Sequence, residues 1–248
     1  MAVWGNLGAG SEVLSVTQKY GGVVLGTLVD GKVVGFIYAF LARYRGRLVH
    51  WSHMMAAAQG FRDRGFGLRM KRLHRKLALA QGIPSICWTY DPLQSRNAAL
   101  NLHRLGARVE EYIPDCYGHF ESRIERGLPS DRFVVEWQIG TARVARRLAG
   151  VGAPSTLSVP AVNETRRNTH GLLENRRLRL GLRDPQLLVE IPTNTDEMRA
   201  RALPLARRWR LETRKVFMRY LEAGYRIDDF ASPDPATGGR CFYLLRRR

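Results

Sequence analysis

The stretch RDRGFG at positions 62–67 separates a segment with strand periodicity from one with helical periodicity. On its N-terminal side, residues 23–29 and 33–41 are apolar and rich in β-branched side chains, and an Asp-Gly pair between them is a strong hairpin signal. Residues 48–57 have the composition of a third strand. We therefore expect three strands that lead into a glycine-rich turn.

A helix is expected immediately after this turn, over residues 68–80, because apolar side chains recur there at near-helical spacing. These side chains are Leu68, Met70, Leu73, Leu77 and Leu79. Gly82 and Pro84 follow, and such a pair is typical of a helix end. The change from strand to helix at the turn is the main guide to the fold.

The next segments continue the alternation of strands and helices. Residues 85–90 read as a buried strand and residues 95–105 as a helix that stops at a glycine. Strands are expected over 108–112 and 133–138. This order predicts an α/β fold, with a mixed and mostly antiparallel sheet flanked by helices, as one domain over residues 1–140.

The C-terminal part is interpreted as two regions. Residues 141–185 carry many Gly, Pro, Ser and Asn residues and read as a linker or irregular region. Residues 186–248 predict a smaller α+β lobe, with strands near 187–191, 225–230 and 241–245 and one long helix over about 196–223.

A half-repeat connects the two regular parts. Residues 102–112 align with residues 220–230, and both read as a helix end, glycine, basic residue, β-branched residue, two acids and an aromatic residue. One interpretation is that the C-terminal lobe resembles half of the first fold. The alternative is that any junction of helix, glycine and strand looks like this.

Composition excludes several protein classes. The longest apolar run, residues 33–42, is far shorter than the roughly 20 residues that span a bilayer. No signal-peptide pattern is present at the start, and Cys87, Cys116 and Cys241 follow no metal-ligand or disulfide pattern. We expect a soluble cytoplasmic protein without a metal and without a membrane partner.

The chain is strongly basic, with 40 Lys and Arg against 22 Asp and Glu and a formal net charge of +18. One interpretation is a polyanionic partner, either nucleic acid or a phosphorylated cofactor. The other is an arginine-rich solvated surface, since no compact basic run is present.

The glycine-rich turn itself suits a phosphate. Gly65 and Gly67 allow close approach of the backbone, and the start of a helix presents unpaired N–H groups with partial positive charge. Arg62 and Arg64 add charge. The turn matches neither the dinucleotide fingerprint nor the P-loop, because the third glycine and the Gly-Lys-Ser/Thr sequence are missing.

Several motifs together resemble the GNAT (Gcn5-related) N-acyltransferase superfamily over residues 22–138. They are, in order, Ser52-His53-Met54, Arg64-Gly65-Phe66-Gly67, Trp88-Thr89-Tyr90-Asp91-Pro92-Leu93 and residues 96–102. The C-terminal third looks like an extension found in a little-characterised bacterial branch of that superfamily. The superfamily's usual first strand and long helix have no clear counterpart in the 21 residues before Gly22.

The resemblance implies an acyl-CoA site. The cofactor-binding residues that it implies are Met55, Ala56 and Ala57 along the pantetheine arm, Arg62, Asp63, Arg64, Gly65, Phe66, Gly67 and Leu68 around the pyrophosphate, and Asn97 near the sulfur end. Acetyl-CoA is the expected co-substrate, with succinyl-CoA as a further option.

The catalytic candidates are His53, Asp91 and Tyr90. His53 titrates near neutral pH and suits a base, and Asp91 follows a strand end, where α/β sheets place ligands. The family often has a tyrosine acid at the position of Leu102, so the proton for the thiolate must come from another tyrosine or from water. The tyrosines considered are Tyr90, Tyr112 and Tyr117.

Three functions remain open at this point. The first is an enzyme that moves an acetyl or succinyl group from CoA to an amino acid or similar small amine by direct attack. The second is a non-catalytic protein with a vestigial CoA pocket whose basic surface binds nucleic acid. The third is an acyltransferase that docks a macromolecular acceptor through Arg207, Arg208 and Arg210. A homodimer is compatible with all three.

Overall fold

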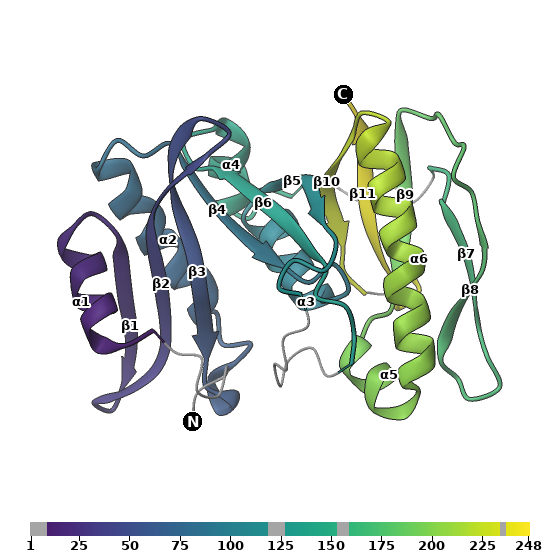
Figure 1. Cartoon of the computed structure of the whole chain (residues 1–248), viewed down its shortest axis with the longest axis horizontal. Helices are drawn as coiled ribbons and strands as arrows, with labels where there is room; N and C mark the ends of the chain where they lie inside the picture. Colours follow the sequence, from purple (N-terminus) through teal and green to yellow (C-terminus); the bar gives the residue numbers. More distant parts are fainter. Residues whose placement is uncertain (1–8, 119–126, 153–158, 234–236) are drawn as a thin grey trace. The chain divides into compact units, whose positions relative to one another are not determined.

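The computed structural model describes residues 9–118, 127–152, 159–233 and 237–248. Its contacts form two compact units (Figure 1). The first unit is the chain up to Thr89 together with Glu136–Arg146, and the second is Tyr90–Val135 together with the chain from Arg147. This grouping differs from the borders at 140 and 185 expected from the sequence. The fold is α/β, with mostly antiparallel strand pairing and flanking helices, as predicted.

Four strands of the first unit lie in the order β1-β2-β3-β4. They are β1 (Val23–Val29), β2 (Lys32–Tyr44), β3 (Arg47–Ala57) and β4 (Ser85–Tyr90). The β1–β2 and β2–β3 pairs are antiparallel, whereas β3 and β4 run parallel. The expected strand ranges are therefore confirmed to within a few residues.

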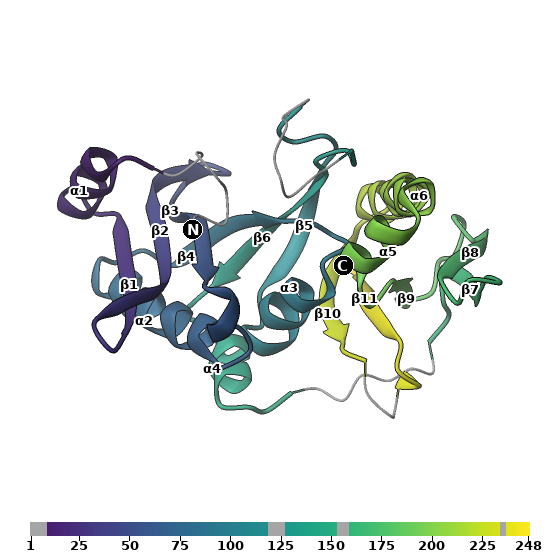
Figure 2. The ribbon, with the colours of Figure 1, turned by 90° about the horizontal axis from the view of Figure 1, so that it is seen from below.

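Two helices cover opposite faces of these strands (Figure 2). On one face, Thr17 of α1 (Ser11–Lys19) lies within 3.5 Å of the Tyr38 hydroxyl. On the other, Met70 of α2 (Phe66–Ala80) packs in a core cluster with Ile37. Because successive side chains of a strand alternate between faces, Ile37 and Tyr38 mark the two sides of β2.

The buried face of α2 differs from the one expected from apolar spacing. Its buried residues are Met70, Lys71, His74 and Ala78, whereas Leu73 and Leu79 are 46% and 40% exposed. Two polar side chains thus occupy core-facing positions where leucine would be expected.

Four strands of the second unit lie in the order β5-β10-β11-β9, and the β5–β10, β10–β11 and β11–β9 pairs are antiparallel. These strands are β5 (Arg108–Ile113), β10 (Tyr225–Ala231), β11 (Cys241–Arg247) and β9 (Gln186–Ile191). Along the chain, β6 (Arg132–Gln138) crosses the border between the units. A separate antiparallel hairpin is formed by β7 (Asn163–Arg167) and β8 (Leu173–Leu178).

Segment 141–185 is more regular than its composition indicates. It contains α4 (Ala142–Leu148) and the β7–β8 hairpin; residues 153–158 lie outside the described part. The short strands carry several arginines and little apolar alternation, so strand periodicity is weak there.

The helices also differ from expectation at two places. The expected helix over 95–105 is α3 (Ser95–Ala98) followed by a π-helical turn, η2 (Ala99–Arg104). The long helix expected over 196–223 is divided into α5 (Thr195–Arg201) and α6 (Leu203–Glu222). Pro204 at the start of α6 explains this break, because proline lacks an N–H and its ring clashes with a preceding helical turn.

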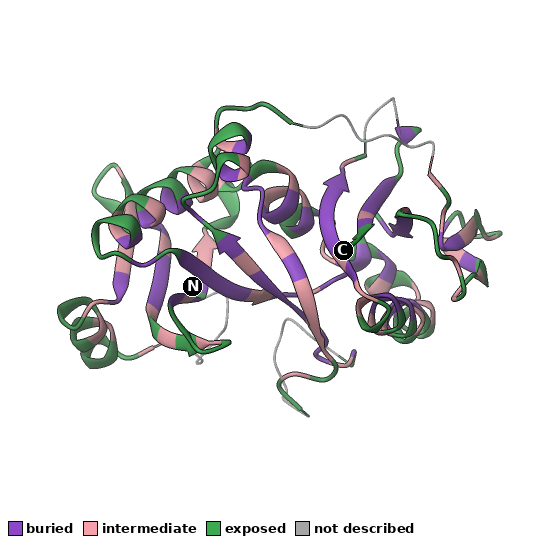
Figure 3. Ribbon diagram, turned by 90° about the horizontal axis from the view of Figure 1, so that it is seen from above, coloured by how far each residue is buried: buried purple, intermediate pink, exposed green. Residues whose placement is uncertain are grey.

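The core of the second unit is aromatic. Phe217 of α6 lies 4.7 Å from Phe133 and 5.4 Å from Tyr243 by ring centroids. Figure 3 shows the inner strands as buried and the outer surface of α6 as exposed. The aromatic contacts fix α6 against the strands.

The half-repeat has a counterpart in the strand register. Val109 and Ile227 occupy equivalent positions in the two aligned segments, and they are direct partners in the antiparallel β5–β10 pair. Gly106 and Gly224, which precede these strands, both have positive φ, 70° and 84°. Both glycines therefore end a helix in the left-handed conformation that favours glycine.

Candidate functional site

The glycine-rich turn joins β3 to α2 within the first unit. A short 3-10 helix, η1 (Gln59–Phe61), leads to Asp63 with φ 60° and then to Gly65 with φ 79°, the residue that caps α2. A Cβ added to Gly65 would meet no atom within 4 Å. The turn therefore combines a left-handed backbone with open space directly before a helix start.

The turn is also lined by cationic side chains. Arg62 is exposed and its Nε donates to the carbonyl of Ala57 at 3.3 Å. The exposed guanidinium groups of Arg64 and Arg69 lie 5.2 Å and 5.8 Å from the ring centroids of Phe61 and Phe66. Open backbone, helix N–H groups and nearby arginines fit a phosphate-bearing ligand.

The neighbouring strand β3 is irregular in two ways. Its parallel pairing with β4 consists of His50 with Ile86 and Trp51 with Cys87. Its pairing with β2 shifts by one residue between Tyr38–Met54 and Ala39–Ser52, so His53 is the extra residue of a β-bulge. From Ser52 onward, β3 is thus released from β4 and bent at His53.

His53, which the sequence predicts as a site residue, lies at this bulge. Its side chain is exposed, and its ring lies 5.9 Å from the Tyr38 ring and 5.8 Å from the Phe40 ring by centroids. Partial burial among these rings lowers the pKa of His53. The imidazole is therefore neutral near pH 7 and can accept a proton.

Tyr90 belongs to the second unit, and its hydroxyl is buried. It donates to the Tyr243 hydroxyl at 3.3 Å, and Tyr243 donates to the carbonyl of Pro92 at 2.7 Å. Burial raises the pKa of Tyr90 well above its usual range. Tyr90 therefore keeps its proton in a closed chain of hydrogen bonds.

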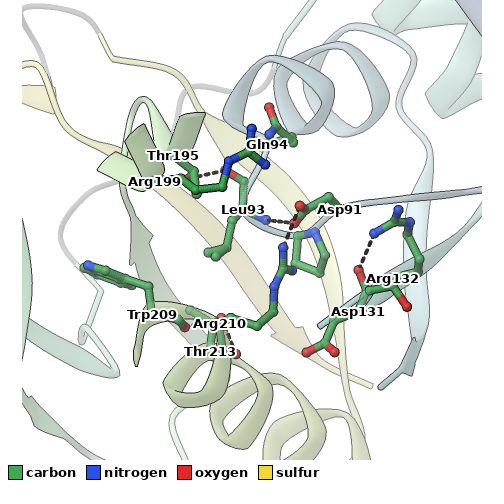
Figure 4. A network of polar contacts seen from close by, with 12 residues as sticks. Asp91, Leu93, Gln94, Asp131, Arg132, Thr195, Arg199, Trp209, Arg210 and Thr213 are labelled. Carbon is green, nitrogen blue, oxygen red and sulfur yellow. Dashed lines mark hydrogen bonds and ion pairs between the residues drawn. The ribbon is translucent and has the colours of Figure 1, made fainter. Parts of the chain in front are cut away.

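Asp91, also in the second unit, already has a cationic partner (Figure 4). Arg210 of α6 donates from Nη2 to the Asp91 carboxylate at 2.5 Å, and the Leu93 N–H donates to the same carboxylate at 2.8 Å. Burial raises the pKa of Asp91, but the Arg210 charge and hydrogen bond outweigh it and lower the pKa overall. Asp91 is a permanently charged ion-pair partner in this geometry.

The same contact revises the docking interpretation of the α6 arginines. Arg210 is 1% exposed, so it cannot contact a macromolecule at the surface. Arg208 is ion-paired with Glu212 at 3.2 Å and donates to the carbonyl of Asn175. Arg207 is exposed.

The remaining candidates have varied surroundings. Tyr112 donates to the buried carboxylate of Asp131, and burial raises its pKa. Tyr117 is 48% exposed, Leu102 is fully buried, and Asn97 is exposed on α3. Leu102 thus occupies a core position.

Sequence reasoning missed a buried polar group between α2 and the strands. Lys71 is 2% exposed, and His74 is fully buried with its Nε2 3.0 Å from Nδ1 of His50. The available signal was that Lys71 and His74 share the core-facing side of α2 with Met70 and Ala78. The spacing of the leucines alone did not indicate that this face of α2 is the buried one.

Within the described ranges, no group of three or more His, Cys, Asp or Glu side chains is arranged to hold a metal ion. In those same parts of the chain, no helix combines the length and apolar character needed to cross a membrane.

Comparisons with known proteins give matches at the level of structure. No protein-family model matches the sequence. No curated protein matches it. Similar solved structures include Arabidopsis thaliana Naa50 in complex with the bisubstrate analogue CoA-Ac-MVNAL, with TM-score 0.43, 14% identity and coverage of 53% of this chain and 82% of that chain.

Two further matches are described as GNAT-family acetyltransferases. One is from Streptococcus pneumoniae, with TM-score 0.43, 13% identity and coverage of 52% of this chain and 77% of that chain. The other, from Elizabethkingia anophelis with acetyl-CoA bound, has TM-score 0.43, 12% identity and coverage of 52% and 83%. These matches span about half of the present chain.

Proposed function

We propose that the protein is an acyl-CoA-dependent N-acyltransferase of the GNAT type. This proposal rests on three features of β3: the end of its pairing with β4, its bulge, and the open turn that follows it. The strand leaves its partner β4 after Trp51, bulges at His53 and leads into the open turn that ends at Gly65. These features follow one another in the order of the sequence motifs that resemble the superfamily.

The residues of this chain suggest how an acyl-CoA would be held. The main chain of Met55, Ala56 and Ala57 would bind the pantetheine arm like an added strand, because β3 is released from β4 in this part. The N–H groups of residues 66–68 and the Arg62 and Arg64 side chains would bind the pyrophosphate.

The proposed reaction is direct acyl transfer to an amine. His53 takes a proton from the ammonium form of the acceptor, and the free amine then attacks the thioester carbonyl. The new C–N bond forms and the C–S bond breaks. The attacking nitrogen loses its second proton to water, and the CoA thiolate takes up a proton. The Tyr90 and Tyr112 hydroxyls are engaged in hydrogen bonds, so we assign this proton to water and not to either of these two tyrosines.

We assign Asp91 and Tyr90 no part in proton transfer. Asp91 holds Arg210, and Tyr90 holds the strand end through Tyr243. The acyl group is acetyl or succinyl, and the acceptor is an amino acid or a similar small amine; an acceptor carboxylate could be bound by exposed arginines.

The test is an assay of free thiol release from acetyl-CoA and succinyl-CoA with a panel of amines and amino acids. We expect one thioester to be consumed in an amine-dependent way. His53→Gln should lower kcat/KM by about 100-fold and remove the acidic limb of the pH profile. His170→Gln, at an exposed histidine of the second unit, is the matched control and should leave the rate unchanged. No amine-dependent thiol release from either thioester would contradict the proposal.

A further inference from the structure

Lys71 lies at the point where β3 and β4 separate. The last pair of their ladder is Trp51 with Cys87. The next residue on each strand contacts Lys71: its Nζ donates to Ser52 Oγ at 3.0 Å and lies 3.7 Å from the Trp88 ring centroid. The Lys71 amine of α2 therefore contacts both strands at the first position beyond the β3–β4 ladder.

This contact is unusual in its electrostatics. Lys71 is 2% exposed, and within the described residues its amine has a hydroxyl and an indole ring as partners but no carboxylate. A buried cation without a counter-charge is costly, and an apolar side chain of similar length would fill the space without that cost. Packing alone therefore does not account for a lysine here.

The groups around Lys71 do not supply the missing negative charge. His74, one turn further along α2, has its pKa lowered to about 2 by burial, with smaller contributions from Lys71 and His50, so it is neutral. His50 Nε2 donates to Gln81 Oε1 at 3.0 Å, which leaves its Nδ1 to accept from His74. This neutral pair joins α2 to β3 two residues before Ser52.

We propose that Lys71 is a positioning residue of the acyl-transfer site, which holds Ser52 and Trp88 at the end of the β3–β4 ladder and thereby fixes the bulge that presents His53. The inference rests on the proposed function for its catalytic consequence. Ser52 immediately precedes His53, so a hydrogen bond from Lys71 to Ser52 restrains the strand on one side of the bulge. Loss of that bond should let the base drift from its productive geometry.

The experiment compares Lys71→Met, Ser52→Ala and the control Lys76→Met, which removes an exposed lysine from the same helix. Three properties are measured on each full-length protein. They are the amide hydrogen exchange of residues 52–57 with residues 23–29 as internal reference, the midpoint of thermal unfolding, and kcat and KM for the preferred acyl-CoA.

We expect Lys71→Met to keep or raise the unfolding midpoint, because methionine removes the buried charge. Exchange of residues 52–57 should nevertheless become faster, and kcat should fall by about 10-fold or more with little change in KM. Ser52→Ala should reproduce both changes in weaker form, and Lys76→Met should match the wild type.

Wild-type exchange and wild-type kcat in Lys71→Met would overturn the proposal. A fall in kcat that accompanies a lower unfolding midpoint and is absent from Ser52→Ala would also overturn it, since packing damage would then explain the loss. Absence of turnover in the wild type would instead refute the proposed function, and the exchange measurement would still decide whether Lys71 fixes the strand.

Discussion

The two units each bury a basic side chain, and they satisfy it in opposite ways. In the second unit, Arg210 is paired with the Asp91 carboxylate, although its Nε and Nη1 have no hydrogen-bond partner among the residues that the structure describes. In the first unit, Lys71 has a hydroxyl and an indole ring. Arg210 is thus neutralised by the Asp91 carboxylate, whereas Lys71, beside the strand bulge, has no carboxylate partner among the described residues.

The pKa values of Arg210 and Lys71 shift in opposite directions for this reason. Burial alone would lower the pKa of Arg210, but the Asp91 charge and hydrogen bond raise it overall. Burial lowers the pKa of Lys71 to about 7 with no opposing charge. The first cation is therefore permanent, and the second can lose its proton near physiological pH.

The largest expected effect concerns the neutralised pair. Asp91→Asn leaves the Arg210 guanidinium buried without its ion-pair partner, and we expect a loss of about 3 kcal/mol in the free energy of unfolding, measured by urea titration. The double variant Asp91→Asn/Arg210→Met should lose less than the sum of the two single variants. A cost below about 1 kcal/mol for Asp91→Asn would show that the pair is not the structural contact described above.

A smaller effect is expected in the pH dependence contributed by Lys71. Because its folded pKa lies below the unfolded value, the unfolded state binds more protons between about pH 7 and pH 10.5, so stability from this group rises with pH there. The wild type should gain about 2 kcal/mol relative to Lys71→Met between pH 7 and pH 9. Urea titrations at each pH give this difference, and Lys76→Met should show none. A flat difference for Lys71→Met would mean that the amine is not buried as described.

The smallest effect is expected at an exposed ion pair. Glu197 and Arg201 on α5 are 3.0 Å apart, and both side chains are about half exposed. Glu197→Gln should change the free energy of unfolding by less than about 1 kcal/mol. A change as large as that of Asp91→Asn would contradict the assignment of the large effect to burial.

The sequence predicted the parts of the fold that depend on local periodicity. Strands β1 and β4 have the expected bounds, and the turn at Gly65 leads into α2 as predicted. Prediction from the sequence failed where tertiary contacts determine which side chains are buried. The buried face of α2 was obscured because Lys71 and His74 take core positions that apolar spacing does not mark.

The same limit applies to the candidate site. Sequence motifs predict His53 and the glycine-rich turn, which are neighbours along the chain, as parts of the site. The motifs could not indicate that the carboxylate of Asp91, another catalytic candidate, forms an ion pair with Arg210, which lies 119 residues further along the chain. Partners so distant in sequence leave no local pattern.

The most direct test of the account is a calorimetric titration with acetyl-CoA at two salt concentrations, using Gly65→Val against the control Gly46→Val. Both glycines have similar positive φ, 79° and 76°, and open space at the Cβ position, so both variants carry similar backbone strain. We expect saturable one-site binding that survives higher salt in the wild type and in Gly46→Val, and its loss in Gly65→Val. Binding that disappears with salt, or that is equal in both variants, would contradict an acyl-CoA site at this turn.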